Sequence, residues 1–414
     1  MKRYVGWLMF SVLLCPLAQA ATEYYDTEYR LTFHPEQHII SVEIRLKGDE
    51  LPSRLRFKAV GDLYRNFSST DSLQKSGSEV EWTPQGKFSR LQYDFVVDHQ
   101  RKPHGFDSLM TDKWAVFRGE KLVPPIAVTA KKKLQARSSL TATLPPNWSM
   151  ITPYAGTNEK IIRFNNARKR FDRPQGWILA GDIGTRSEIV AGIQTTVAAP
   201  TGDNARRQDT LAFLNWTLPK LLEIFPQFPR RILVVFAGDP MWRGGLSGPG
   251  SVFVHSDRPL ISENRTSTLL HELVHVALGI HGDEESDWIV EGIAEYYSLE
   301  TLRRSKSIDQ QRYEESLRSL EKWARRAPNL FVPNSSGATT ARAVIAFKQA
   351  DDEIRAATHG KASLDDVARQ LEETGGEVTL QSLQAAAERV AGKPVIAFSR
   401  ERLTSGPPSA APAR

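Results

Sequence analysis

The sequence predicts a multidomain protein, in which an N-terminal antiparallel β-sandwich precedes an α+β domain that is largely helical. Short apolar segments, often alternating with polar residues, recur from about residue 24 to residue 185, as is typical of sandwich strands. Beyond residue 302 the apolar residues instead recur at helical spacing. A length of 414 residues is sufficient for two to three domains with sizeable cores.

The N-terminus has the order of a secretory signal peptide. Lys2 and Arg3 precede an apolar run over 5–17, and Ala18-Gln19-Ala20 follows, so we expect a signal over 1–20 that is cut after Ala20. The apolar run is short for a membrane span, and no later segment resembles one. We therefore expect a secreted protein, located in a bacterial periplasm, with no integral membrane segment after cleavage.

The cysteine content and the charge of the chain further narrow the class of protein. Cys15 is the only cysteine and lies within the predicted signal, so the mature chain has no disulfide. Leu14 stands before it, where a lipidation site requires a small residue. The net charge is +6, and basic runs occur at 131–133 and 168–170. These runs lack the interleaved aromatic residues that stack on bases, so we interpret them as solvated faces and expect no nucleic-acid partner.

The first domain is predicted over 21–187 and contains no cluster of His, Asp and Glu at ligand spacing. It therefore resembles a scaffold or a wall for the substrate, and its three tryptophans, Trp82, Trp114 and Trp148, are expected in the core. Its clearest strands are expected at 29–35, 39–48, 90–99 and 138–145.

The second domain, predicted over 188–402, opens with a helix at 209–225 in which Pro219 predicts a kink or break. Strands follow at 231–238 and 251–256, separated by a glycine-rich stretch. That stretch is either an ordinary hairpin or the edge of an active-site cleft, where backbone groups pair with an extended peptide. In the second case Gly244, Gly245 and Leu246 bind the substrate.

The segment 266–297 carries the strongest functional signal. His271 and His275 stand four residues apart in a predicted helix, capped by Ser262 or Thr266 and ended by Gly279, so both rings share one face. With Glu272 they form the H-E-x-x-H pattern of zinc hydrolases. A second predicted helix, beginning near Asp287, presents Glu291 as a third ligand for one Zn²⁺ per chain. The alternative is an amphipathic helix with two solvated histidines.

The C-terminal part is predicted to be helical, with a capping box at Ser363 and Asp366. The composition of residues 403–414 predicts a disordered tail. The expected helices span 309–327, 341–358, 364–374 and 380–391.

The sequence HELVH, followed by WIVEGIAEYY, resembles the glycyl aminopeptidase family of gluzincin metallopeptidases. The resemblance extends at lower similarity to residues 29–46, 144–150, 236–248 and 350–371. It implies a β-sandwich followed by a thermolysin-like zinc peptidase domain. It also implies that His271, His275 and Glu291 are the zinc ligands and Glu272 the general base. Glu295 then hydrogen-bonds the first ligand histidine.

The chain departs from that family in three ways. The glycine turn continues into Ser247 and Gly248, where relatives commonly have a Glu that binds the free amine of a substrate. A downstream Tyr that stabilises the oxyanion aligns with Thr340. The chain also lacks the C-terminal PDZ domain of many relatives. Four residues are alternative oxyanion donors: Tyr296, Tyr297, Tyr313 and His359.

These observations favour a secreted zinc metallopeptidase acting on a peptide or protein. In this hypothesis Glu272 accepts the proton of a zinc-activated water that attacks the peptide carbonyl. One alternative is a catalytically weak or inactive peptidase-like binding protein, and another is a zinc hydrolase of a non-peptide amide. The sequence fixes neither the cleavage specificity nor the oligomeric state.

Overall fold

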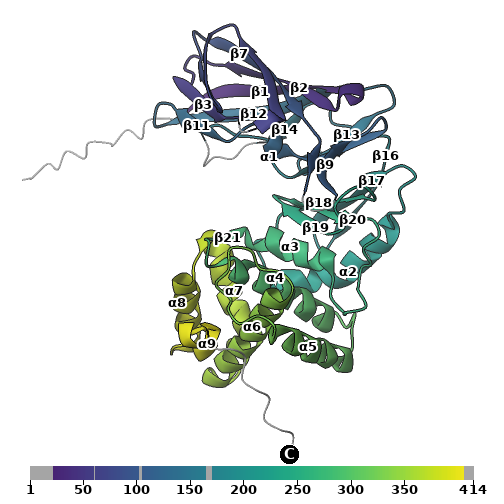
Figure 1. The fold of residues 1–414 in the computed structure, drawn as a ribbon, viewed down its shortest axis with the longest axis vertical. Helices are drawn as coiled ribbons and strands as arrows, with labels where there is room; N and C mark the ends of the chain where they lie inside the picture. Colours follow the sequence, from purple (N-terminus) through teal and green to yellow (C-terminus); the bar gives the residue numbers. More distant parts are fainter. Residues whose placement is uncertain (1–21, 60, 102–104, 165–169, 405–414) are drawn as a thin grey trace, which may run out of the picture.

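The computed structural model describes residues 22–59, 61–101, 105–164 and 170–404. The predicted signal peptide lies outside these residues. Figure 1 shows a strand-rich unit at one end, a helical unit at the other, and a further sheet between them. Among the described residues, no helix is both long and apolar enough to cross a membrane.

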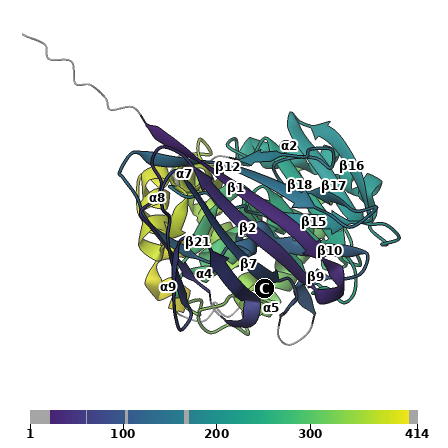
Figure 2. The same cartoon turned by 90° about the horizontal axis from the view of Figure 1, so that it is seen from above.

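The N-terminal unit consists of three sheets whose strands share one apolar core. The largest has the order β14-β12-β1-β2-β7-β4, and Figure 2 shows β12, β1, β2 and β7 side by side. Buried and more exposed residues alternate along these strands, as expected where one face packs on the core. The strands of this sheet are β1 (Glu23–His34), β2 (Ile39–Lys47), β4 (Tyr64–Ser69), β7 (Phe88–Val96), β12 (Leu134–Thr143) and β14 (Ile162–Phe164).

The two smaller sheets have the orders β13-β15-β10-β9-β8 and β11-β3-β6-β5. Trp82 is fully buried in the core, whereas Trp114 and Trp148 are partly buried and pack at core margins. The strands are β3 (Arg54–Lys58), β5 (Ser72–Ser76), β6 (Glu79–Thr83), β8 (His99–Gln100), β9 (Phe106–Met110), β10 (Trp114–Arg118), β11 (Ile126–Thr129), β13 (Ser149–Ile151) and β15 (Trp177–Gly181).

Pairing in the N-terminal unit is antiparallel as predicted, with one exception. Strands β1 and β12 pair in parallel over ten residues, from Glu23 opposite Leu134 to Thr32 opposite Thr143. Alternation of apolar residues determines which face of a strand is buried, but not the direction of a partner about a hundred residues away. The largest sheet is therefore mixed.

The sheet between the two units has the order β16-β17-β18-β20-β19. One face of its central strands packs on helices, through residues such as Val234 and Val252. The other face packs on β10 and β15 of the N-terminal unit, through Leu233 and Phe253. This burial on both faces explains the continuous apolar runs in the sequence. The strands are β16 (Ile183–Val190), β17 (Ile193–Pro200), β18 (Arg231–Ala237), β19 (Gly245–Gly248) and β20 (Ser251–His255).

Two predicted boundaries shift in the structure. The division between residues 187 and 188 falls inside β16, which pairs with β17 along its whole length, so we place the second domain from Ile183 onward. The prediction of a disordered tail from residue 403 is wrong for residues 403 and 404, because α9 (Arg400–Thr404) includes both and Leu403 is buried. The rest of the tail lies outside the described residues.

Helix α2 (Arg207–Ile224) runs through Pro219 without interruption, so a break there is wrong. Burial of Leu214, Leu218 and Leu221 against the sheet offsets the hydrogen bond that proline cannot make. The capping box at Ser363 and Asp366 is confirmed. The remaining elements are α1 (Gly119–Leu122), α3 (Thr268–Leu278), β21 (Ile280–Gly282), α4 (Asp287–Arg304), α5 (Gln310–Ala324), α6 (Ala338–Ala357), α7 (Leu364–Thr374), β22 (Gly376–Val378) and α8 (Leu380–Ala391).

Replacing Gly292 by alanine tests the close packing of α4 on α6. A Cβ at this position would lie 2.4 Å from Ala343 Cβ and 3.1 Å from the ring of Phe347. Overpacking costs about 1–3 kcal/mol, against a gain in helix propensity of roughly 1 kcal/mol. We expect Gly292→Ala to lower the free energy of unfolding by about 1–2 kcal/mol, measured by denaturant titration in excess chelator. Gly156→Ala, where a Cβ meets open space, should leave stability unchanged.

Glu372 provides a pH-dependent stability term. Its Oε1 accepts a hydrogen bond from the Gln227 amide (3.0 Å), but burial raises the pKa of its carboxyl to about 7. Ionisation is thus less favourable in the folded chain than in the unfolded one, and stability decreases as pH rises from about 4.5 to about 7. We expect Glu372→Gln to remove this decrease and to stabilise the protein by about 1–2 kcal/mol at pH 8. Glu373→Gln, a matched exposed control, should not.

Candidate metal centre

Helix α3 places the two histidines, and its ends are fixed by local interactions. The side chain of Ser267 accepts a hydrogen bond from the Leu270 amide (3.3 Å), so the N-cap is Ser267. The predicted caps, Ser262 and Thr266, instead hydrogen-bond each other in the preceding turn (3.2 Å). Gly279 ends the helix as predicted, with a φ of 58° that favours glycine.

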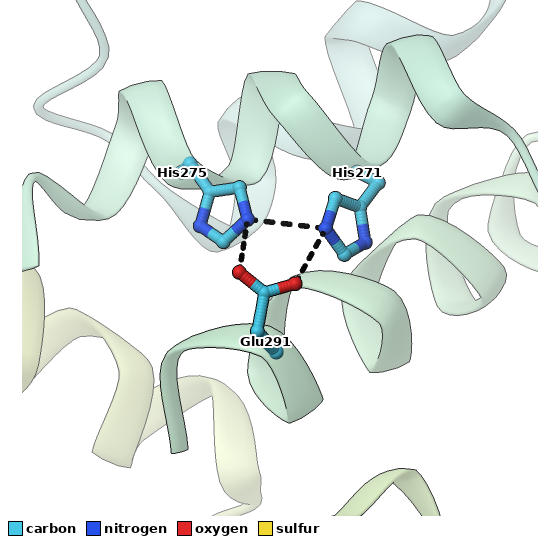
Figure 3. A group of neighbouring side chains, drawn as sticks. All are labelled: His271, His275 and Glu291. Carbon is cyan, nitrogen blue, oxygen red and sulfur yellow. Dashed lines mark hydrogen bonds and ion pairs between the residues drawn. The ribbon is translucent and has the colours of Figure 1, made fainter. Parts of the chain in front are cut away.

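His271, His275 and Glu291 converge on one point between α3 and α4 (Figure 3). The Nε2 atoms of the two rings are 3.1 Å apart. The carboxylate of Glu291 faces both rings, with Oε2 lying 3.3 Å from His271 Nε2 and Oε1 lying 3.5 Å from His275 Nε2. Two helices that are separate in the sequence thus bring together three residues that each offer one ligand atom for a metal ion.

The donor set and its spacing would suit one zinc ion. Zinc binds histidine nitrogen and carboxylate oxygen, and one such atom from each of the three residues lies within 4.8 Å of the others. The separation of 3.1 Å between the two Nε2 atoms is close to the roughly 3.3 Å expected between two ligands of a tetrahedral zinc ion. An ion held by these three side chains would keep a fourth position for water, as in catalytic zinc sites.

The ionisation of the three residues reflects their mutual contacts. Burial disfavours the charged ring of His271, but hydrogen bonds to Glu291 and Glu295 hold its pKa well above the ordinary value. Burial, reinforced by the charge of His271, lowers the pKa of His275 to about 4. Burial opposes the ionisation of Glu291, yet its contacts with both histidines lower its pKa overall. The carboxylate of Glu291 therefore favours a positive charge beside it, either a proton on His271 or a metal ion.

Glu295 lies one turn beyond Glu291 on α4 and contacts the far side of the His271 ring. Its Oε2 lies 2.9 Å from His271 Nδ1. A hydrogen bond donated by Nδ1–H leaves the lone pair on Nε2, the atom that faces Glu291. This contact fixes both the tautomer and the orientation of the ring.

Glu272 is buried between α3 and strand β19. A Cβ on Gly245 would lie 2.7 Å from Glu272 Cγ, so only glycine leaves room for this carboxylate. Burial raises the pKa of Glu272, while the charge of His271, a hydrogen bond from Ser247 and the charge of Arg118 act against that rise. The carboxylate is therefore held beside the three converging residues without joining them.

The cluster opens into a cleft of about 1380 Å³ that contains all the predicted site residues. Strand β19 pairs with β20 in a hairpin and is also the edge strand of its sheet. The two interpretations of the glycine-rich stretch, as a hairpin and as a cleft edge, therefore describe the same element. Gly244, Gly245 and Leu246 line the cleft. Two of their carbonyl groups are occupied, because Gly244 accepts from the His255 amide (2.9 Å) and Leu246 from the Trp177 indole (2.8 Å).

The alternative oxyanion donors do not line this cleft. Tyr296 and Tyr297 are buried within the helical core, and Tyr313 is buried with its hydroxyl bonded to Glu300. His359 is exposed at the end of α6 and lies outside the cleft lining. Lining groups that the sequence analysis missed come from a loop and from the N-terminal unit: Arg101, Arg118, Asn334, Ser335 and Ser336. No local spacing signals them, because they meet the site only through the fold.

Comparison with known proteins gives a fold and no sequence family. The sequence matches no family model and no curated protein. Solved structures do match. An aminopeptidase N family protein from Idiomarina loihiensis has a TM-score of 0.68 and 16% identity, over 92% of this chain and 76% of that one. An M1 zinc metallopeptidase from Deinococcus radiodurans has a TM-score of 0.59 and 16% identity, over 95% and 96%.

A third structure, yeast LTA4 hydrolase, has a TM-score of 0.58 and 15% identity, over 95% of this chain and 69% of that chain. The fold is therefore that of the two-domain M1 zinc metallopeptidases, with a sheet-rich N-terminal part and a helical C-terminal part. At these identities the likeness extends to the fold alone.

Removing the contact between Glu295 and His271 should weaken metal binding. Loss of a carboxylate partner from a ligand histidine typically lowers metal affinity by roughly 10- to 100-fold. We expect Glu295→Ala to show this decrease for Zn²⁺ in competition with a chromophoric chelator. Glu284→Ala removes an exposed carboxylate outside the cluster and serves as the control. Equal zinc affinity in the two variants would contradict the assigned role.

Proposed function

We propose that the chain is a secreted zinc-dependent metallopeptidase that hydrolyses peptide bonds in the cleft between β19 and α4. The observation that carries the proposal is the convergence of His271, His275 and Glu291 at a spacing that would suit one metal ion, with Glu272 beside them. A scaffold that only bound partners would have no need for a buried carboxylate at that position. A periplasmic location follows from the predicted signal peptide.

In this proposal each residue has a separate task. His271, His275 and Glu291 hold one Zn²⁺, and Glu295 orients His271. Zinc in such a site lowers the pKa of a bound water toward neutrality and polarises a carbonyl oxygen. Glu272 accepts the proton of the attacking water and passes it to the amine of the leaving peptide. Gly244, Gly245 and Leu246 form the wall along which an extended peptide lies.

Structures of the same fold support a peptide as the substrate class. An M1 zinc metallopeptidase from Deinococcus radiodurans is described with a Tyr-Ser-Ala substrate bound, and a two-domain M1 enzyme with L-arginine bound. The present chain covers 94% and 95% of its own length in these matches. Both the sheet-rich part and the helical part are thus included in the shared fold.

A catalytically weak or inactive peptide-binding protein is the second candidate. The observation that favours it is the absence, among the residues described, of a tyrosine in the cleft lining that could stabilise an oxyanion. Asn334, Ser335 and Ser336 line the cleft near Glu291 and supply other hydrogen-bond donors. Direct assay of cleavage separates the two candidates.

The decisive experiment compares Glu272→Gln with the unmodified protein. Loss of a positioned general base typically costs roughly 10²- to 10⁴-fold in rate. We expect the variant to bind one zinc per chain by elemental analysis and to lose cleavage of casein and of a mixed peptide library by at least a hundredfold. His271→Ala should lose both the metal and the activity.

Unchanged turnover in Glu272→Gln would refute the catalytic assignment. If the unmodified protein binds zinc and cleaves neither casein nor the library, the inactive binding protein becomes the better description. Assay of non-peptide amides beside the peptides then tests for an amide hydrolase.

A further inference from the structure

Two arginines of the N-terminal unit form part of the cleft wall. Arg118 is the last residue of β10, and Arg101 follows β8. Both line the cleft that contains the metal cluster, although neither belongs to the domain that carries it. Their presence gives this wall a positive charge.

Arg118 lies close to the expected site of cleavage. It pairs in register with Trp177 of β15, and its guanidinium lies 5.1 Å from the centre of the Trp177 ring. The indole of Trp177 in turn donates a hydrogen bond to the Leu246 carbonyl of β19, at 2.8 Å. Strand β19 packs directly on Glu272, so the arginine is one aromatic ring away from the wall that faces the general base.

The charge of these arginines is weakly compensated. The nearest carboxylate oxygen of Glu120 is 3.7 Å from Arg118, longer than a hydrogen bond, and the other oxygen of Glu120 accepts from the Gly176 amide (2.9 Å). Arg101 stacks over Trp242 at 4.3 Å, and Trp242 also lines the cleft. Within the described part of the chain, no oxygen accepts a hydrogen bond from either guanidinium, so their N–H donors are available to a ligand.

A smaller cavity of about 180 Å³ shares both arginines with the cleft. Lys121 adds a third cation to its lining, and Phe95 and Val97 provide apolar surface. The one carboxylate in this lining, Asp107, is engaged by the ring of His99. An apolar wall with unneutralised cations suits a short side chain that ends in a carboxylate.

We propose that Arg118, together with Arg101, forms an anion-recognition subsite that selects peptides with a glutamate or aspartate beside the cleaved bond. This inference rests on the proposed peptidase function and specifies its substrate class. A cationic wall repels the ammonium group of a lysine side chain and attracts a carboxylate, so recognition of charge at this wall favours acidic side chains.

Matched peptides test the inference by hydrolysis. Two heptapeptides, acetylated and amidated at their ends and otherwise all alanine, carry a central glutamate in one and a central glutamine in the other. The unmodified protein should cleave the glutamate peptide with the higher kcat/KM. Arg118→Gln should reduce the ratio of the two kcat/KM values roughly ten- to a hundredfold, the range expected for one charged hydrogen bond. Arg118→Lys should retain part of the preference.

The ratio, rather than either rate, is the measurement, because Arg118 also influences Glu272 through its charge. Any general effect of the substitution on catalysis changes both rates equally and leaves the ratio unaltered. Arg54→Gln removes an exposed arginine of the same unit, remote from the cleft lining, and should leave the ratio unchanged. Equal cleavage of the two peptides by the unmodified protein, or an unaltered ratio in Arg118→Gln, would overturn the inference.

Binding to the zinc-loaded Glu272→Gln protein separates this inference from the peptidase proposal. Calorimetry should show tighter binding of the glutamate peptide than of the glutamine peptide, and Arg118→Gln in the same background should abolish the difference. If the unmodified protein hydrolyses no peptide, the peptidase proposal fails. The difference in affinity between the glutamate and glutamine peptides still shows whether the subsite recognises an anion. Equal affinities for both peptides would refute the subsite even if hydrolysis is observed.

Discussion

The structure depends on holding two imidazole nitrogens 3.1 Å apart between two helices, with one carboxylate oxygen of Glu291 at 3.3 Å from the first and the other at 3.5 Å from the second. The imidazole nitrogens and carboxylate oxygens repel each other unless a cation lies among them, so the scaffold must enforce their approach. Helix α4 is therefore clamped along its length. Gly292, beside the ligand Glu291, packs directly on α6, and at the far end Arg304 forms an ion pair with Asp365 of α7 at 2.7 Å. In the proposed function this enforced geometry favours a divalent ion, because an ion would relieve the repulsion that the fold imposes.

The five-stranded sheet connects this cluster to the rest of the molecule. Its central strands are buried on both faces, by helices on one side and by β10 and β15 on the other, so the two units form one continuous packing arrangement. Strand β19 remains at the edge because the chain turns at 249–250 and returns as β20. That edge supplies the cleft wall, and Gly245 leaves the space in which Glu272 sits. The N-terminal unit therefore contributes to the site through packing and through two arginines, as well as acting as a scaffold.

Local patterns predicted the features that depend on local physics. The i, i+4 spacing of His271 and His275 and the capping box at Ser363 require only helix geometry, and both occur as expected. Features that depend on distant partners were missed. The parallel direction of β1 and β12 and the contribution of Arg118 to the cleft arise from pairings between residues far apart in the sequence. The prediction that one of the tyrosines is an oxyanion donor failed for a related reason, because helical position alone does not show which face of α4 or α5 is buried.

Charge connects the metal cluster to the arginine wall. Glu272, Glu291 and Glu295 place three carboxylates around the proposed metal site, so negative charge would remain in excess with one divalent ion bound and all three ionised. Burial and the charge of Glu291 both raise the pKa of Glu272, yet a general base must be ionised to accept a proton. The charges of His271 and Arg118 oppose that rise. The same guanidinium can attract an acidic substrate only if the carboxylates do not fully neutralise it, and it lies over the Trp177 ring rather than in a hydrogen bond with one of them. In the two proposals, Arg118 therefore has two effects: its charge favours the ionised form of Glu272, and it attracts the carboxylate of an acidic substrate.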